Sequence, residues 1–331
     1  IQKYMNGYTI LSRAICLAAA VVLLNSCAAR YGYVQITGYA QGGTYSVKAD
    51  LDGTGKTPEC VKEKIDSILS AVDNSVSGYN KSSLLSRFNA GENVVKDSIF
   101  TELCELGDRY AALTDDAVNV WAAPLFDIWG FGFTRDSLPS PKLIAEAKAR
   151  CESRKKVNFN AIAQGYSSDV VADYLRKIGV KNMLVDVGGE MYGQGVNPSG
   201  KNWTIGIDSP VDGNYEPGAS IQDVYKLPVA PCGIVTSGNY RKFYVKDGRK
   251  YAHTIDPRTG LPVAHNLLRA TVISSDPSST RNSTDADAFA TYCMVVGLEQ
   301  AQKFILSNPH LEAILIYDEN GQMKTWRSDR Q

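Results

Sequence analysis

The sequence has few of the features that mark nucleic-acid-binding or zinc proteins. Its 331 residues carry 35 Lys and Arg against 35 Asp and Glu, with no long basic run. A chain without a basic stripe is a poor match for a polyphosphate backbone, so we expect no nucleic-acid partner. Seven cysteines are present, but none forms a CxxC pair. This spacing argues against a zinc site and a disulfide framework, and most of these thiols are expected to be buried.

The first 26 residues are predicted to be a signal peptide. Lys3 and Arg13 give a basic start, and the apolar run 14–24 is too short to span a bilayer as a mature helix. The run ends in Leu24-Asn25-Ser26-Cys27, which matches the lipobox of bacterial lipoproteins. The alternative is an ordinary signal peptide that contains a cysteine.

We therefore expect Cys27 to carry lipid and to anchor the protein in a membrane. Residues 27–38 would form a tether, and residues 39–331 would form one folded domain. The protein is expected to be exported and held at the periplasmic face of the cell envelope.

Hydrophobic periodicity predicts the α+β class, with a single domain, mixed β-sheets and flanking helices. Helices and strands do not alternate strictly, so a doubly wound sheet is disfavoured. Predicted helices cover 58–74, 99–113, 140–151, 158–177, 284–296 and 298–307, and predicted strands cover 184–187, 203–208, 268–274 and 313–317. A hairpin is predicted over 243–252, and a glycine-bearing hairpin or bulge over 39–47.

The chain is also poor in histidine, with three, and one of them stands beside a rigid turn. His253 is expected at the end of the second hairpin strand, followed by Asp256-Pro257-Arg258-Thr259-Gly260. Asp-Pro starts a turn and Gly260 can end it with φ > 0. Arginine, hydroxyl and backbone N–H groups in such a loop can hold phosphate. The alternative is a tight structural turn with a satisfied histidine.

A second candidate site lies on the predicted helix 284–296. Asp287 and Thr291 are four residues apart, so both side chains share one helix face. A carboxylate and a hydroxyl are hard ligands suited to Mg²⁺, which completes its octahedron with water and phosphate. The alternative is that the acids near 285 only favour a helix start.

Three further stretches are candidates for binding. Tyr79 stands in the polar loop 75–83, either as surface or as a stacking platform for a flat ring. The asparagine-rich stretch that begins at Asn158 leads into a helix and suits an anion. A buried strand ends in Gly188-Gly189-Glu190, a pattern typical of close approach.

Together these stretches resemble the ApbE family of FAD:protein FMN transferases, over nearly the whole mature chain. The most specific markers are Thr236-Ser237-Gly238-x-Tyr240, His253-x-Ile255-Asp256-Pro257-x-Thr259-Gly260 and Ala286-Asp287-Ala288-x-Ala290-Thr291. The resemblance implies the T-fold-related architecture of that family. It also implies Mg²⁺-dependent transfer of FMN from FAD to a Thr or Ser hydroxyl of an acceptor flavoprotein subunit, with a phosphoester product and AMP released.

The resemblance also implies roles for individual residues. The metal ligands would be the carbonyl of Ala161, Asp287 and Thr291, and the catalytic residues would be His253 and Asp287. His253 would either accept the proton of the incoming hydroxyl or contact phosphate, and Tyr79 would stack on adenine or flavin. The positions contacting FAD would be Gln41, Tyr79, Ala117, Val118, Asn119, Asn158, Gln164 and Ile255.

Some positions depart from the usual family pattern. Gln41 stands where Met is common, and Gly43 where Thr is common; Asn119 and Asn158 replace Asp, and Gln164 replaces Lys. Two alternatives therefore stay open. Water in place of the acceptor hydroxyl would make the protein an FAD pyrophosphatase, and a site without catalysis would make it a flavin-binding lipoprotein.

Overall fold

A computed structural model of the chain describes residues 31–130, 138–208, 221–238, 243–246, 249–252 and 254–328. The predicted leader, Cys27, Tyr240 and His253 lie outside the described residues. No helix within these ranges is long and apolar enough to cross a membrane.

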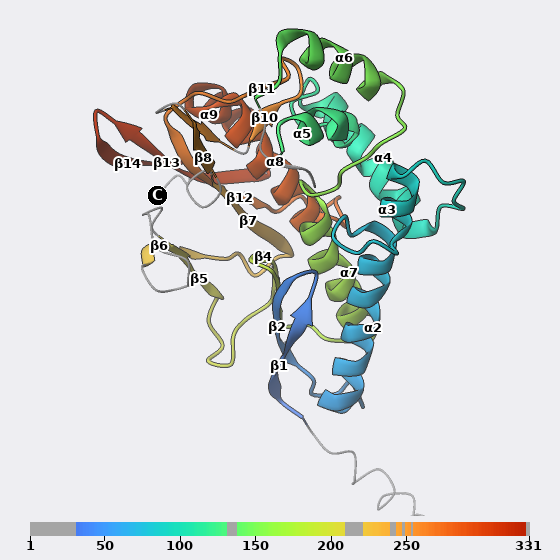
Figure 1. The fold of residues 1–331 in the computed structure, drawn as a ribbon. Helices are drawn as coiled ribbons and strands as arrows, with labels where there is room; N and C mark the ends of the chain where they lie inside the picture. The colour runs from blue at the N-terminus through green and yellow to red at the C-terminus, as the bar shows by residue number, and fades with distance from the viewer. Residues whose placement is uncertain are drawn as a thin grey trace, which may run out of the picture.

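One eight-stranded sheet forms the centre of the fold (Figure 1), and each strand pairs with its neighbours antiparallel. In spatial order the strands are β1 (Tyr33–Ala40), β2 (Gly43–Asp50), β3 (Met183–Val187), β4 (Glu190–Gln194), β7 (Cys232–Gly238), β12 (Leu267–Ser274), β13 (Leu311–Glu319) and β14 (Gln322–Arg327). The predicted α+β class is thus present, with a large antiparallel sheet where we expected mixed pairing.

Helices cover one face of this sheet (Figure 1). Helix α7 (Ala163–Lys177) packs on β3 and β4, and α8 (Asn282–Val296) packs on β7 and β12. Around them lie α2 (Pro58–Val76), α3 (Leu84–Asn89), α4 (Ser98–Leu113), the 3₁₀ turn Val120–Ala122, α5 (Ala123–Ile128), α6 (Pro141–Glu152) and α9 (Leu298–Ser307). Helices α7 and α8 pack together, and the Gly165 N–H near the start of α7 donates to Asp287 near the start of α8.

The other face of the sheet is covered by a hairpin, because the central strands carry apolar residues on both faces. Neighbouring residues of a strand point to opposite faces, and in β7 and β12 both positions are apolar. Val235 and Val272 belong to the core under the helices. Ile234 and Ile273 instead pack against the hairpin of β5 (Thr204–Asp208) and β6 (Ile221–Lys226). The described hairpins β8–β9 (Phe243–Lys246, Arg249–Ala252) and β10–β11 (Ile255–Asp256, Leu261–Pro262) are separate from this sheet.

Most predicted elements are found, with one difference that matters for the site. We predicted a helix from about Asn158, but α7 begins only at Ala163. The Asn158 side chain accepts a hydrogen bond from the backbone N–H of Asn160, two residues ahead, at 2.8 Å. Such a side-chain bond competes with the helix and holds the segment before α7 as a loop.

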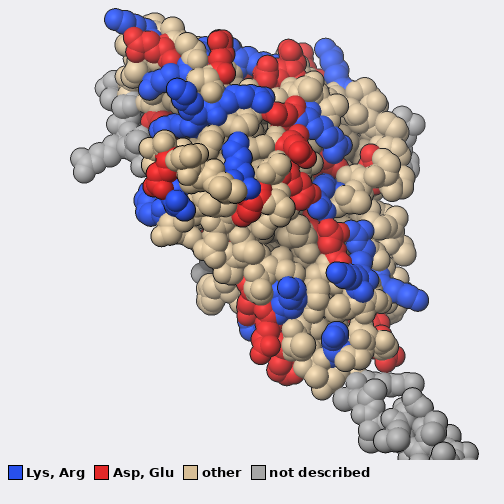
Figure 2. All heavy atoms as spheres, turned by 90° about the vertical axis from the view of Figure 1, so that its right-hand side faces the viewer, with Lys and Arg blue, Asp and Glu red and all other residues tan. Residues whose placement is uncertain are grey.

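The surface agrees with the balanced composition. On the face shown in Figure 2, basic and acidic side chains are interspersed, and neither sign forms a continuous field. This view therefore offers no electrostatic track for a polyanion.

Candidate active site

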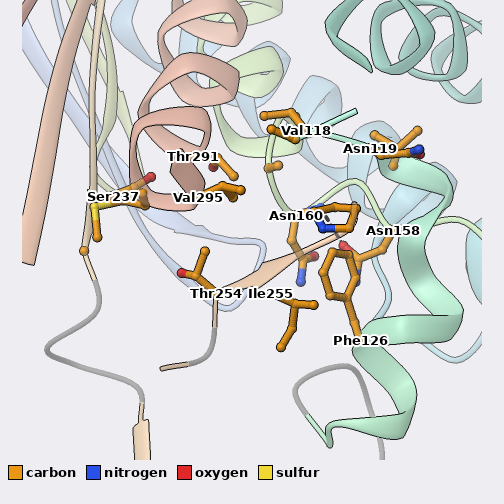
Figure 3. Close-up of a pocket in the computed structure, with 16 residues that line it drawn as sticks. Val118, Asn119, Phe126, Asn158, Asn160, Ser237, Thr254, Ile255, Thr291 and Val295 are labelled. Carbon is orange, nitrogen blue, oxygen red and sulfur yellow. Dashed lines mark hydrogen bonds between the residues drawn. The ribbon is translucent and has the colours of Figure 1, made fainter. Parts of the chain in front are cut away.

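A cavity opens where five segments of the chain meet, 117–126, 158–161, 237–238, 254–257 and 291–295. Its wall comes from residues 117–120, from Phe126 of α5, from the loop 158–161, and from the ends of β7 and α8, with β10 closing it. Figure 3 shows Ser237, Thr291 and Val295 on one side of the space, with Val118, Asn119 and Phe126 on the other. Its empty volume is about 850 Å³, part of it open to solvent, which is within the size range of ligand sites.

A second cavity adjoins the first. Asn160 lines both, and the rest of the second wall comes from the end of α2, from the β1–β2 turn and from the start of α7. Tyr79 stands on this wall with 70% of its surface exposed. Two adjoining cavities suit a ligand with two flat ends and a polar middle.

The structure brings the predicted FAD-contacting residues together on these two walls. Ala117, Val118, Asn119, Asn158 and Ile255 line the first cavity, as do the predicted metal ligands Ala161 and Thr291. Gln41, Tyr79 and Gln164 line the second cavity. His253, the predicted proton acceptor, lies outside the described residues.

Local hydrogen bonds fix several of these side chains. Asn119 caps the 3₁₀ turn, with its Oδ1 accepting from the Trp121 N–H at 2.8 Å. Gln41 has φ of 53° at the β1–β2 turn, and its Nε2 donates to Ser167 of α7 at 2.6 Å. The Asn119 bond holds the 3₁₀ turn, and the Gln41 bond joins the β1–β2 turn to α7.

Asp287 is held between the two helix starts. It is 4% exposed, and its Oδ2 accepts a hydrogen bond from the Gly165 N–H at 3.1 Å. Because α7 has no capping side chain of its own, this carboxyl satisfies one of its free N–H groups. Burial raises the pKa of Asp287 to about 7, with the Gly165 N–H opposing and the Asp169 carboxylate adding to that shift.

Gly165 explains why the two helices can approach so closely. A Cβ atom at this position would lie 2.4 Å from the carbonyl oxygen of Ser283 and 2.9 Å from the Cβ of Asp287. Only glycine leaves room for that backbone contact. The start of α7 therefore reaches Asp287, and Ala161 lies just before it in the chain.

Side-chain bonds hold the loop after His253. Arg258 and Thr259, which we predicted could hold phosphate, both bond within the turn. The Arg258 guanidinium pairs with both carboxylate oxygens of Asp256 at 2.9 Å. The Thr259 hydroxyl contacts the Asp256 carbonyl at 3.4 Å and accepts from the Leu261 N–H. The predicted tight turn is present, and Gly260 has the expected positive φ of 76°.

Two side chains from the helical layer support this turn from behind. The Trp129 indole donates to the Gly260 carbonyl at 2.8 Å, and the Lys148 ammonium donates to the Arg258 carbonyl at 2.5 Å. The turn carries Ile255 and Pro257 into the first cavity, so these bonds fix one of its walls.

Comparison with known proteins identifies the family and the fold. The sequence model of the ApbE family matches residues 41–315. The chain belongs to the ApbE family. It is 32% identical to the FAD:protein FMN transferase of Escherichia coli K12, over 81% of this chain and 80% of that protein. It is 28% identical to the Haemophilus influenzae FAD:protein FMN transferase, over 97% of this chain and 95% of that protein.

Solved ApbE structures confirm the α+β prediction. The flavin transferase ApbE from Vibrio cholerae superposes with a TM-score of 0.75 at 29% identity, covering 89% of this chain and 97% of that one. The flavinyl transferase ApbE of Pseudomonas stutzeri, in its apo form, gives 0.76 at 30% identity, covering 89% and 94%.

Sequence reasoning missed two features of this ApbE site. Asn160, which lines both cavities, was part of the asparagine-rich stretch but was not assigned a contact. Phe126, which lines the first cavity, was not assigned a contact either. A local pattern could not have identified either contact, because the cavity is formed by segments far apart in the chain.

Proposed function

We propose that this chain transfers the FMN half of FAD to a hydroxyl of a Thr or Ser in an acceptor protein. The hydroxyl oxygen bonds to the FMN-side phosphorus, the bond to the AMP oxygen breaks, and the hydroxyl proton is lost. What carries the proposal is that all eight predicted FAD contacts line two cavities that share Asn160. The names of the relatives, FAD:protein FMN transferase, support the same reaction.

The donors around the start of α7 suit a hard divalent cation. We propose that Asp287, Thr291 and the Ala161 carbonyl hold Mg²⁺, because all three offer oxygen, which this ion prefers. Among the described residues, no group of three or more His, Cys, Asp or Glu could hold a metal; this set relies instead on a hydroxyl and a carbonyl. When bound, Mg²⁺ would neutralise charge on the pyrophosphate.

The chain's own groups then bind and orient the substrate. Ala163 and Gln164 at the start of α7 line the second cavity beside Asn160. The Asn160 side chain can reach a ligand in either cavity, since it lines both. His253 stays our predicted proton acceptor or phosphate contact.

We further propose that the protein acts from a membrane surface. The lipobox ending at Cys27 supports a lipid anchor, and the apolar run before it supports export. Feeding cells a radiolabelled fatty acid tests this anchor. We expect the wild-type protein to carry the label in the membrane fraction, and Cys27→Ala to carry none.

Mass spectrometry of a Thr-bearing acceptor domain tests the reaction. After incubation with this protein, FAD and Mg²⁺, we expect the acceptor to gain the mass of an FMN ester and AMP to appear in equal amount. An acceptor with that Thr changed to Ala is the control and should gain nothing. Equally fast AMP release without acceptor would instead identify a pyrophosphatase, and flavin binding without AMP would identify a carrier.

Tyr79→Ala is expected to raise the KM for FAD about tenfold, with a smaller effect on kcat. Aromatic stacking on a base contributes on the order of 1–3 kcal/mol, and binding energy common to ground and transition states appears in KM. Tyr39→Ala is the matched control, because Tyr39 is 88% exposed and lines neither cavity. Equal KM values in both variants would remove Tyr79 from the FAD site.

A further inference from the structure

Glu190 carries a buried polar atom that the described structure leaves unsatisfied. It begins β4, directly after Gly188 and Gly189, whose φ values of 70° and 109° form the turn from β3. Its Oε2 atom is buried and has no hydrogen-bond partner among the described residues. An unpaired buried carboxylate oxygen is costly, so a partner from outside the chain would stabilise it.

Glu190 and Asp287 are both bonded to the start of α7: the Glu190 carbonyl accepts from the Ser168 hydroxyl at 2.6 Å, and the Asp287 carboxyl accepts from the Gly165 N–H. Burial raises the pKa of Glu190 well above its usual range, and the Asp287 carboxylate adds to the shift. Among the described residues, no lysine, arginine or histidine offsets the charge of either group. Two neighbouring acidic side chains therefore share one buried region without a protein cation.

Gln164 borders the same region. A Cβ atom built on Gly188 would lie 2.1 Å from the Gln164 Nε2 and 3.4 Å from the Glu190 Oε2. The amide nitrogen and the carboxylate oxygen thus flank one glycine. Gln164 also lines the second cavity beside Asn160 and Ala163, so the region adjoins the proposed substrate site. A lysine at position 164 would bring an ammonium group here.

We propose that Glu190 is a second carboxylate of the cation site. The uncharged side chain of Gln164 leaves this carboxylate available to the cation. The divalent ion would then be attracted by Asp287 and Glu190 together. This inference rests on the proposed function, because it extends the Asp287–Thr291 site. Oxygen donors and two negative charges match a hard divalent cation, and supporting carboxylates tune metal affinity strongly.

Titration calorimetry with MgCl₂ alone, on the EDTA-treated full chain at pH 8, tests this without FAD or acceptor. We expect Glu190→Gln to weaken Mg²⁺ binding about 10- to 100-fold, the usual range for a supporting ligand. Gln164→Lys should weaken it as well, because the ammonium competes with the ion. Glu105→Gln on the exposed face of α4 and Gln35→Lys on β1 make the same chemical changes elsewhere and should bind as the wild type does.

A second readout is stability in EDTA. Glu190→Gln and Gln164→Lys should unfold at higher urea concentrations than the wild type, because the first removes a carboxyl with an unpaired buried oxygen and the second brings a cation beside it. Added Mg²⁺ should stabilise the wild type more than either variant. If Glu190→Gln binds Mg²⁺ as tightly as the wild type while Asp287→Asn loses binding, this inference is wrong and the proposed cation site stands. Unchanged affinity in both would overturn the cation site itself.

Discussion

Replacing Asp287 with asparagine is expected to lower FMN transfer by about 100- to 1,000-fold, the range found when one preorganised electrostatic group is removed. Asparagine keeps the shape and can still accept the hydrogen bond from Gly165 that α7 requires. What it loses is the charge that attracts the cation. The measurement is the rate of FMN-labelled acceptor formation at saturating FAD and fixed Mg²⁺, with AMP followed in parallel.

Asp285→Asn is the matched control for this prediction. Asp285 lies on the same helix and is 2% exposed, but its oxygens accept from the Tyr110 and Ser279 hydroxyls at 2.7 and 2.6 Å. This variant should lose stability and keep its transfer rate at a temperature where it is folded. Transfer by Asp287→Asn within a few-fold of the wild type would show that the metal assignment is wrong.

The pair Asp287 and Thr291 illustrates what the sequence could predict. Their spacing of four residues places both on one helix face whatever the fold is. The contact that defines the site, however, joins Asp287 to Gly165, which is 122 residues earlier in the chain. No local pattern shows that two helix starts will meet, because the approach depends on space available only at Gly165.

The FAD contacts show a second boundary of sequence reasoning. Their assignment came from the family resemblance, and the structure places them on two adjoining walls. The phosphate role of Arg258 was predicted from residue type alone, and the local sequence did not show that its guanidinium would pair with Asp256, two residues away. Glu190 was noticed only as part of a two-glycine turn, since its burial beside Asp287 depends on long-range packing.

Phe159 connects the core to the site, and Phe159→Ala is expected to lower the free energy of unfolding by about 3–5 kcal/mol. The side chain is 1% exposed, and its ring packs edge-on against Phe100 with centroids 5.5 Å apart. Its carbonyl accepts from the N–H groups of Ile162 and Ala163. Truncation leaves a cavity beneath the loop that presents Asn158 and Asn160. Urea denaturation followed by circular dichroism measures the loss.

The same variant should raise the KM for FAD, measured at a temperature where it is still folded. The loop 158–161 lines the first cavity, and its position depends on the Phe159 anchor. Leu175→Ala is the control: this residue is also fully buried, but in the cluster between α7 and β3. A Leu-to-Ala change costs about 2–5 kcal/mol, so stability should fall comparably while KM stays unchanged. An equal rise in KM for both variants would mean that general destabilisation, and not the loop anchor, controls FAD binding.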